Sequence, residues 1–441
     1  MVDSPNSELT KTVDRESPRA PYPWYALLAT HSDFLNSLDC IYDMFKLVGP
    51  ILESKDKERQ HRIEEIGKEI NDADGRVGRK LKSLEDVKEF MGHLRKMRTA
   101  DRMFRQNIVV SVVSKFDEFL ADLLREFYKA NPNWLRNPSK TITYKELFEA
   151  ESVDRLRSDL IQREVENLMR DSHHAQIAFI DEKLKLGLQE EFTGWTAFLE
   201  ITERRNIFVH NGGCVNDAYL SNAKKLGFTP NSKARVGVLL DASDEYIRNT
   251  IDYCYELSVR VVQGAVRRLY PDGIEDADLA LNNPTVNLLT EERWGLAERI
   301  FAYALGIPEK LRTPGEWYYF YLINYCISLK FAGKQIKDVL GRVQWKVFHP
   351  KYHFAVAVLE DRFDDAAKLM LTESVRKSID REQFLGWPLF REFRKTDAFQ
   401  NAFGDIYGQN EQIEILRKAE SDLRAEQIVG HEAPEDASSD G

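Results

Sequence analysis

The amino-acid sequence predicts an all-α protein with more than one domain. Apolar residues recur at steps of three and four over long stretches, which is typical of helices that bury one face. Charged residues make up 30% of the chain, a high share that suits solvated helix faces. The 441 residues are enough for two or three domains with a sizeable core.

The N-terminal part is expected to contain a tail and a helical hairpin. Residues 1–22 are polar and contain several prolines, which predicts a disordered tail. Apolar residues at helical spacing predict a helix over 24–49, and glutamates and lysines at helical spacing predict a second one over 52–72. We expect residues 23–99 to pack on the following domain in a structural role that includes dimerisation.

Residues 100–272 are expected to form one helical bundle. The most regular amphipathic pattern runs over 104–128, where apolar residues occupy three- and four-residue steps. Similar patterns predict helices around 143–171, 173–188 and 243–269. The last of these closes the bundle before a proline and a glycine at 271 and 273.

The C-terminal part is predicted to hold helical pairs. We expect a polar linker up to Pro284, a helical domain over 284–428 and an acidic disordered tail over 429–441. Helices are predicted over 291–305, 316–331, 334–347, 349–359 and 363–370. The last pair loosely resembles tetratricopeptide-type repeats, although no period of about 34 residues is present. Such arrays bind a protein or peptide on a concave face; the alternative is a plain helical domain that shields its neighbour.

A helix that ends at Gly212-Gly213 carries the most informative residues of the chain. Thr193 is its expected N-cap, and the two glycines are a stop signal. At about 100° per residue, Asn206 falls within the apolar face, with Arg205 and His210 on its flanks. Arg204 points to another side, which predicts a solvated charge. His210 lies in the last turn, where the helix carbonyls favour a cation.

The string Arg205-Asn206-Ile207-Phe208-Val209-His210-Asn211-Gly212 resembles the motif of HEPN-family ribonucleases. The resemblance covers residues 100–272 and implies an all-α bundle that forms a homodimer, in which two such motifs meet at a shared cleft. It also implies metal-independent RNA cleavage that leaves a 2′,3′-cyclic phosphate and a 5′-hydroxyl. Members of this family often serve in defence against phage or in toxin-like responses.

The resemblance assigns roles to five residues. His210 would transfer a proton and Arg205 would stabilise charge on the phosphoryl oxygens. Asn206 occupies the family's polar position and would orient the phosphate or the histidine, with Asn211 as an auxiliary residue. Asp117, after an aromatic residue on the 104–128 helix, matches the family's acidic position. It would pair with Arg205 or hold the His210 tautomer; the alternative is a solvent-facing carboxylate.

The charge of the chain is uneven. Its net charge of −10 argues against a dedicated nucleic-acid coat protein, yet residues 76–105 contain ten Lys or Arg against four acidic residues. This stretch would guide an RNA backbone towards the motif, or it is a solvated helix face. The candidates for RNA contacts are Arg95, Lys96, Arg98, Arg102 and Arg105.

Other patterns give no second chemistry. His349 and His353 have a metal-friendly spacing, but Pro350 belongs at a first helical position, so His349 is expected as an N-cap. His173 and His174 are adjacent and point in different directions, which disfavours a metal. There is no phosphate-binding glycine loop, and we expect no cofactor. The four scattered cysteines, the polar N-terminus and the absence of a long apolar run predict a cytoplasmic protein without a membrane segment.

Two functions follow from these patterns. The first is a metal-independent endoribonuclease that acts on tRNA or mRNA, is homodimeric and is regulated through its C-terminal helices. The second is a non-catalytic scaffold, in which the bundle only dimerises and Arg205, Asn206 and His210 form a buried hydrogen-bond network. The scaffold would bind a protein partner through its C-terminal helices.

Overall fold

The all-α prediction is confirmed by the computed structural model, which describes residues 22–72, 77–136, 141–230 and 234–408. Within these ranges every regular element is a helix, and the one isolated β-bridge joins Cys214 to Leu239. The chain divides into two compact units between Ala277 and Asp278. The two expected tails lie almost wholly outside the described residues. No helix in the described ranges is long and apolar enough to cross a bilayer.

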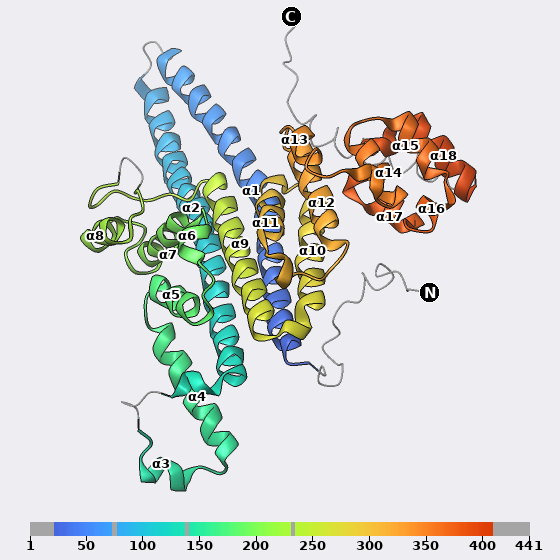
Figure 1. Ribbon diagram of the computed structural model, residues 1–441. Coiled ribbons are helices and arrows are strands. Elements are labelled where there is room, and N and C mark those ends of the chain that lie inside the picture. The colour runs from blue at the N-terminus through green and yellow to red at the C-terminus, as the bar shows by residue number, and fades with distance from the viewer. Residues whose placement is uncertain (1–21, 73–76, 137–140, 231–233, 409–441) are drawn as a thin grey trace, which may run out of the picture. The chain divides into compact units, whose positions relative to one another are not determined.

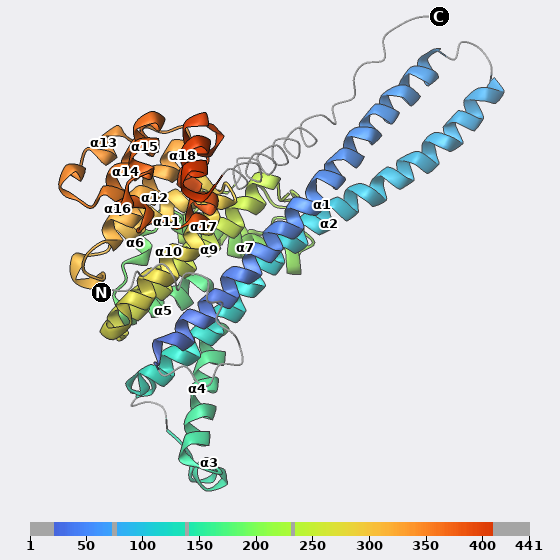
Figure 2. The ribbon, with the colours of Figure 1, turned by 90° about the vertical axis from the view of Figure 1, so that its right-hand side faces the viewer.

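Two long helices form the frame of the first unit. Helix α1 spans Trp24–Asp72 and α2 spans Val77–Ala130, and they lie side by side in Figures 1 and 2. The sequence predicted two helices between residues 24 and 72, but α1 continues through Pro50. The helix predicted over 104–128 is the C-terminal part of α2. The described part of residues 23–99 therefore lies on α1 and α2, in the same compact unit as the bundle.

Helix α9 (Asp244–Leu269) completes the core of this unit and matches its predicted bounds closely. The Ser243 side chain accepts a hydrogen bond from the Tyr246 N–H, which caps its first turn. The acidic residues in the first turn and the arginines in the last turn both interact favourably with the helix dipole. The core contacts include Phe34 of α1, which stacks on Phe119 of α2 at 4.6 Å between ring centroids.

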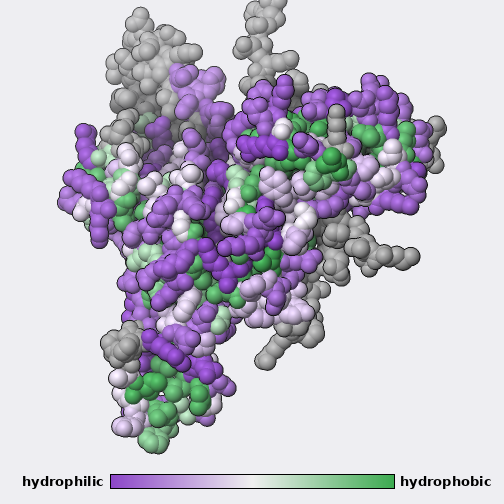
Figure 3. All heavy atoms as spheres, viewed as in Figure 1, coloured by the Kyte–Doolittle hydropathy of each residue, from purple (hydrophilic) through white to green (hydrophobic). Residues whose placement is uncertain are grey.

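The segment predicted as one helix over 143–171 is two helices, α3 (Tyr144–Glu149) and α4 (Val153–Met169). The break has a local cause, because Ser152 caps α4 through the Arg155 N–H. Around α3 several apolar side chains are exposed, and they form part of the green area at the lower end of Figure 3. These side chains are Ile142, Leu147, Phe148 and Val153.

Four further helices complete the first unit. They are α5 (His173–Leu184), α6 (Leu188–Glu191), α7 (Trp195–His210) and α8 (Asp217–Leu226). Helix α7 ends where the glycine pair predicted, since Gly212 and Gly213 have φ angles of +57° and +84°. Its N-cap is Gly194 and not the expected Thr193. A Cβ at Gly194 would lie 2.4 Å from the Tyr253 ring, so the chain needs glycine there.

The second unit, from Asp278 onward, is a series of short helices. The expected linker before Pro284 is instead helix α10 (Ile274–Thr290), which contains that proline and crosses the division between the units. Helix α11 pairs with α12, and α14 pairs with α15, as the sequence predicted. The helix predicted over 334–347 is reduced to α13 and a 3₁₀ turn at Trp345–Val347. The bounds are α11 (Trp294–Gly306), α12 (Trp317–Phe331), α13 (Lys337–Leu340), α14 (Pro350–Leu359), α15 (Phe363–Met370), α16 (Glu373–Arg376), α17 (Arg381–Gly386) and α18 (Asp397–Tyr407).

Candidate active site

Helix α7 presents Arg205 to α2. The Arg205 Nη2 lies 3.3 Å from Asp117 Oδ2, and its Nη1 lies 3.3 Å from Asn206 Oδ1. Of the alternatives for Asp117, the structure therefore has the carboxylate paired with Arg205 and not facing solvent alone. Asn206 contacts the guanidinium of its neighbour. Three of the five residues predicted for the site, Arg205, Asn206 and Asp117, are thus in contact.

A third helix contributes a residue that the sequence did not assign to this site. His173, the first residue of α5, places its Nε2 2.7 Å from Asp117 Oδ1. The two oxygens of Asp117 are thus used by different partners, His173 and Arg205. The contact joins residues 56 positions apart in the sequence, and no local pattern around His173 indicates it.

The cluster formed by Asp117, His173, Arg205 and Asn206 is partly open to solvent, and we call it the open cluster. The side chains of Asp117 and Arg205 are 27% and 23% exposed, while that of His173 is 11% exposed. The Arg205 Nε is buried and has no hydrogen-bond partner among the described residues. Such a donor costs free energy unless an acceptor reaches it. The guanidinium therefore retains one donor that the described residues do not use.

His210 ends α7 on the surface, five residues beyond Arg205. It is exposed, and no side-chain hydrogen bond or ion pair holds it within the described part of the chain. The carbonyl at Ile207 accepts from the backbone N–H groups of Asn211 and Gly213, at 3.0 and 3.1 Å. The Asn211 side chain donates to the Cys214 carbonyl. The helix end is thus satisfied by its own loop, and the imidazole is left accessible.

The loop after His210 packs against α2. Residue 213 has to be glycine, because its φ is +84° and a Cβ would lie 2.6 Å from the Gln106 Nε2. That amide nitrogen is buried and lacks a hydrogen-bond partner among the described residues. The backbone N–H of Leu240 donates to the Gly213 carbonyl at 2.8 Å. No sequence pattern indicated Gln106, whose side-chain amide is a further buried donor without a partner among the described residues.

Arg204 is buried, which corrects the prediction that it is a solvated charge. Its Nε lies 2.7 Å from Glu200 Oε1, its Nη1 donates to the Asp241 carbonyl, and its Cζ lies 4.0 Å above the Tyr246 ring. The hydroxyls of Tyr219 and Tyr246 both donate to the Glu200 carboxylate, at 2.7 and 2.8 Å. We call these four side chains the closed cluster.

The reason for the correction is helix α8. It covers the side of α7 that faces away from α2 (Figure 1), so α7 has two buried sides and not one. Burial opposes the charge on Arg204, but Tyr246 and Glu200 together raise the pKa of the guanidinium. Burial and the Glu200 charge raise the pKa of both tyrosines, which stay protonated and act as donors.

The thiol next to the open cluster is not a nucleophile. Cys254 of α9 is fully buried, and burial together with the nearby Asp117 charge raises the pKa of its thiol. The thiol therefore stays protonated at neutral pH, and a protonated thiol is unreactive. Cys254 is therefore not a candidate nucleophile at this site.

The predicted RNA-binding residues differ in what surrounds them. Arg95, Lys96 and Arg98 are exposed on α2, and Arg102 is half-buried. Arg105 instead pairs with Asp101 at 3.1 Å and with Asp244, and its side chain is 15% exposed. Burial opposes its charge, but the hydrogen bonds and negative charges of Asp244 and Asp101 together outweigh burial and raise the pKa of Arg105. Its charge is thus neutralised within the protein. Arg76, at the start of the basic stretch, lies outside the described residues.

The histidines considered for a metal have other partners. No group of three or more potential metal ligands occurs in the described ranges. His349 caps α14 as predicted, with its side chain accepting from the Lys351 N–H, and its Nε2 lies 3.2 Å from Ser374 Oγ. His353 Nε2 lies 2.7 Å from the Trp345 carbonyl.

Comparison with known proteins leaves the site to be interpreted from its own chemistry. No protein-family model, curated protein or solved structure matches the chain.

Proposed function

We propose that this chain is a metal-independent endoribonuclease in which Arg205, His210 and Asn206 are the catalytic residues. The observation that carries the proposal is the state of Arg205. Its guanidinium is fixed by Asp117 and Asn206, yet its Nε is a buried donor without an acceptor. The side chain is still 23% exposed, so the exposed part of the guanidinium can donate to a phosphate oxygen, and charge-assisted bonds of this kind are the strong ones.

The chemistry requires two proton transfers and one cation. The 2′-hydroxyl forms a bond to the adjacent phosphorus, and the bond from phosphorus to the 5′-oxygen breaks. One group accepts the proton of the 2′-hydroxyl, and another donates a proton to the leaving 5′-oxygen. Arg205 stabilises the negative charge on the phosphoryl oxygens during this exchange. The products are a 2′,3′-cyclic phosphate and a 5′-hydroxyl, so neither water nor a metal is needed for the cleavage step.

A second copy of the chain would supply the second proton-transferring group. One chain contributes one His210, and the HEPN resemblance implies that two motifs share a cleft. The surface beside His210 supports such a contact because it exposes apolar side chains. Val209 is 47% exposed, and Val236 and Leu239 on the neighbouring loop are also exposed. A homodimer that covers this surface would bring the two histidines together.

His173 and Asp117 act as positioning residues in this proposal. Asp117 accepts from His173 through one oxygen and from Arg205 through the other. Its carboxylate therefore cannot rotate without breaking one of the two contacts, and this fixes the direction of the guanidinium. A fixed guanidinium needs no reorganisation when the phosphate arrives, which is the basis of electrostatic preorganisation.

The biological setting of the proposal follows the HEPN resemblance. The substrates would be tRNA or mRNA, and the role would be defence against phage or a toxin-like response. The alternative is a scaffold that binds a protein partner through its C-terminal helices, with Arg205 and Asp117 as a structural ion pair. Expression in cells separates these two, because only a nuclease would slow growth in a way that Arg205→Ala or His210→Ala relieves.

The decisive experiment is cleavage of mixed tRNA and mRNA by purified wild type and His210→Ala in excess EDTA, with analysis of the RNA ends. His61→Ala is the matched control, because His61 is an exposed histidine on α1 with a 76% exposed side chain. The proposal expects 2′,3′-cyclic phosphate ends from wild type and from the control, and none from His210→Ala. Equal activity in all three would assign the cleavage to another site. Inactivity of all three would favour the scaffold.

A further inference from the structure

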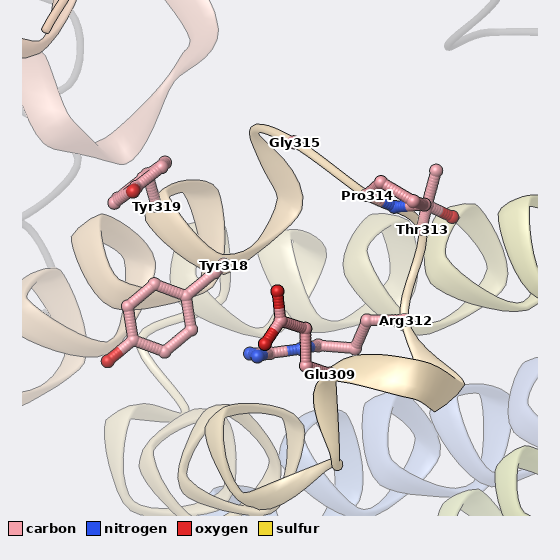
Figure 4. A pocket seen from close by; sticks show the side chains of 7 residues that line it. All are labelled: Glu309, Arg312, Thr313, Pro314, Gly315, Tyr318 and Tyr319. Atoms are coloured by element: carbon pink, nitrogen blue, oxygen red, sulfur yellow. The ribbon is translucent and has the colours of Figure 1, made fainter.

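The second unit contains a small cavity at the start of α12. The 3₁₀ turn Glu309–Leu311 and the loop that follows it border a half-open cavity of about 200 Å³ (Figure 4). Polar and aromatic side chains line it together. They include Glu309, Arg312, Thr313, Tyr318 and Tyr319.

The loop around the cavity is held in place from outside. The Thr313 N–H donates to Asp278 Oδ2 at 2.8 Å, and the same carboxylate accepts from the Tyr321 hydroxyl at 2.8 Å. At the other end of the loop, Lys351 Nζ lies 2.5 Å from Glu316 Oε2. Gly315 takes the turn between them with a φ of +105°. The cavity is therefore formed before any ligand arrives, which lowers the cost of binding.

Two polar atoms of the cavity residues have no partner. The Arg312 Nη1 and the Thr313 Oγ1 are buried and make no hydrogen bond within the described part of the chain. The Arg312 guanidinium lies over Tyr318, with Cζ 4.8 Å from the ring centroid. Because Arg312 also lines the cavity, an acceptor on a ligand is expected opposite the part of its guanidinium that faces the cavity.

The carboxylate of Glu309 decides what kind of ligand fits. Figure 4 shows the side chains of Glu309 and Arg312 next to each other, with Tyr318 and Tyr319 on one side. A simple anion would satisfy Arg312 but would be repelled by Glu309. A planar ring with acceptors on one edge and donors on the next would satisfy both residues and contact the aromatic rings.

We propose that this cavity binds a guanine base. Arg312 would donate to O6 and N7, the commonest pairing of arginine with guanine, and Glu309 would accept from N1–H and the 2-amino group. Adenine does not fit these two residues, because its N1 is an acceptor and would face the Glu309 carboxylate. The size agrees, since an apolar cavity of about 150 Å³ holds benzene, and a purine is somewhat larger. The base belongs to a free guanine nucleotide or to an unpaired guanosine of single-stranded RNA, whose bases are read in this way.

The first arm of the test is calorimetric titration of the full-length His210→Ala protein with GMP, AMP and inorganic phosphate. We expect GMP to bind at least about tenfold more tightly than AMP, which corresponds to one good bidentate pair, and phosphate to bind no better than AMP. Glu309→Gln should weaken GMP binding about tenfold, and Arg312→Ala should abolish it. Lys310→Ala is the matched control, since it removes a neighbouring exposed cation and should leave GMP binding unchanged.

The second arm identifies the source of the base. A fluorescent oligouridylate is compared with the same strand containing one guanosine. If the protein prefers the guanosine strand, loses this preference in Glu309→Gln and does not bind GMP, the site is assigned to RNA. If the protein binds GMP and shows no preference between the strands, the site is assigned to a free nucleotide. Equal affinity for GMP and AMP together with no preference between the strands would overturn the proposal, as would tighter binding by Glu309→Gln. Because binding is measured without cleavage, the outcome is independent of the proposed nuclease activity.

Discussion

Two neighbouring arginines on α7 lie in opposite kinds of surroundings. In the closed cluster, Arg204 is sealed between α7, α8 and α9, and Glu200 accepts from both tyrosine hydroxyls. In the open cluster, Arg205 is partly exposed and keeps an unpaired donor. The first arrangement satisfies its own groups and contributes to stability. The second leaves part of the guanidinium exposed to groups outside the protein, and that difference is why we propose a function for Arg205 and not for Arg204.

The largest expected effect is on stability, in the closed cluster. Glu200→Ala leaves the buried Arg204 without its carboxylate, and breaking a buried ion pair costs about 3–5 kcal/mol of the free energy of unfolding. Chemical denaturation measures this loss. Glu203→Ala on the same helix is the control, because its carboxylate only accepts from Asn222 at a partly exposed position, and it should cost less than about 1 kcal/mol. A similar small loss for both variants would mean that the closed cluster contributes little.

The second effect is on activity, in the open cluster. Arg205→Lys keeps the charge but removes the planar fork, so we expect RNA cleavage to fall about 10²- to 10³-fold. The melting temperature should change little, because the side chain is partly exposed. Arg204→Lys should do the reverse, with a lower melting temperature. Single-turnover cleavage and thermal unfolding of both variants test the contrast, and wild-type cleavage by Arg205→Lys would remove Arg205 from the mechanism.

A smaller effect is expected for the positioning histidine. His173→Ala releases one oxygen of Asp117 and should slow cleavage about ten- to a hundredfold through a less fixed Arg205. His173→Gln retains an N–H group that can reach Asp117, so it should recover most of the rate. The readout is the cleavage rate at saturating RNA, which separates kcat from KM. If both variants are equally slow, the imidazole does more than hold Asp117.

The smallest effect concerns pH and a third polar site, in the interior of the bundle. His31 of α1 lies 3.1 Å from Ser258 Oγ, and burial lowers its pKa to about 3. Because the folded-state pKa lies below the unfolded value of about 6.5, its contribution to stability is present above pH 6.5 and decreases as the pH falls towards 3. When the pH falls from 7.5 to 5.5, the free energy of unfolding of the wild type should decrease by about 1 kcal/mol more than that of His31→Gln. Denaturation curves at the two pH values check this, and parallel losses would contradict it.

Local features of the site could be predicted from the sequence alone. The end of α7 followed from Gly212 and Gly213, and the cap of α14 followed from the order of His349 and Pro350. These features depend on residues within a few positions of each other. The pairing of Asp117 with Arg205 was one of several alternatives that the HEPN resemblance suggested. The structure selects among them.

Contacts between helices that are far apart in the sequence could not be predicted from the sequence. The burial of Arg204 depends on Tyr219 and Tyr246, and the helix that carries Tyr219 was not predicted at all. A helical-wheel argument assumes one buried face, whereas α7 is covered on two. The contact of His173 with Asp117 likewise joins α5 to α2. The expected linker became α10, because nothing in the residues before Pro284 prevents them from continuing a helix.

The position of two arginines side by side on α7 has a mechanical consequence. Neighbouring residues on a helix differ by about 100° in direction. The contacts of Arg204 with Asp241 and Tyr246, which lie outside α7, therefore oppose rotation of α7 about its axis. The same restraint fixes the direction in which Arg205 points. Inserting or deleting one residue between Trp195 and Arg204 would therefore change the directions of both arginine side chains at once, because both are set by the rotation of the same helix.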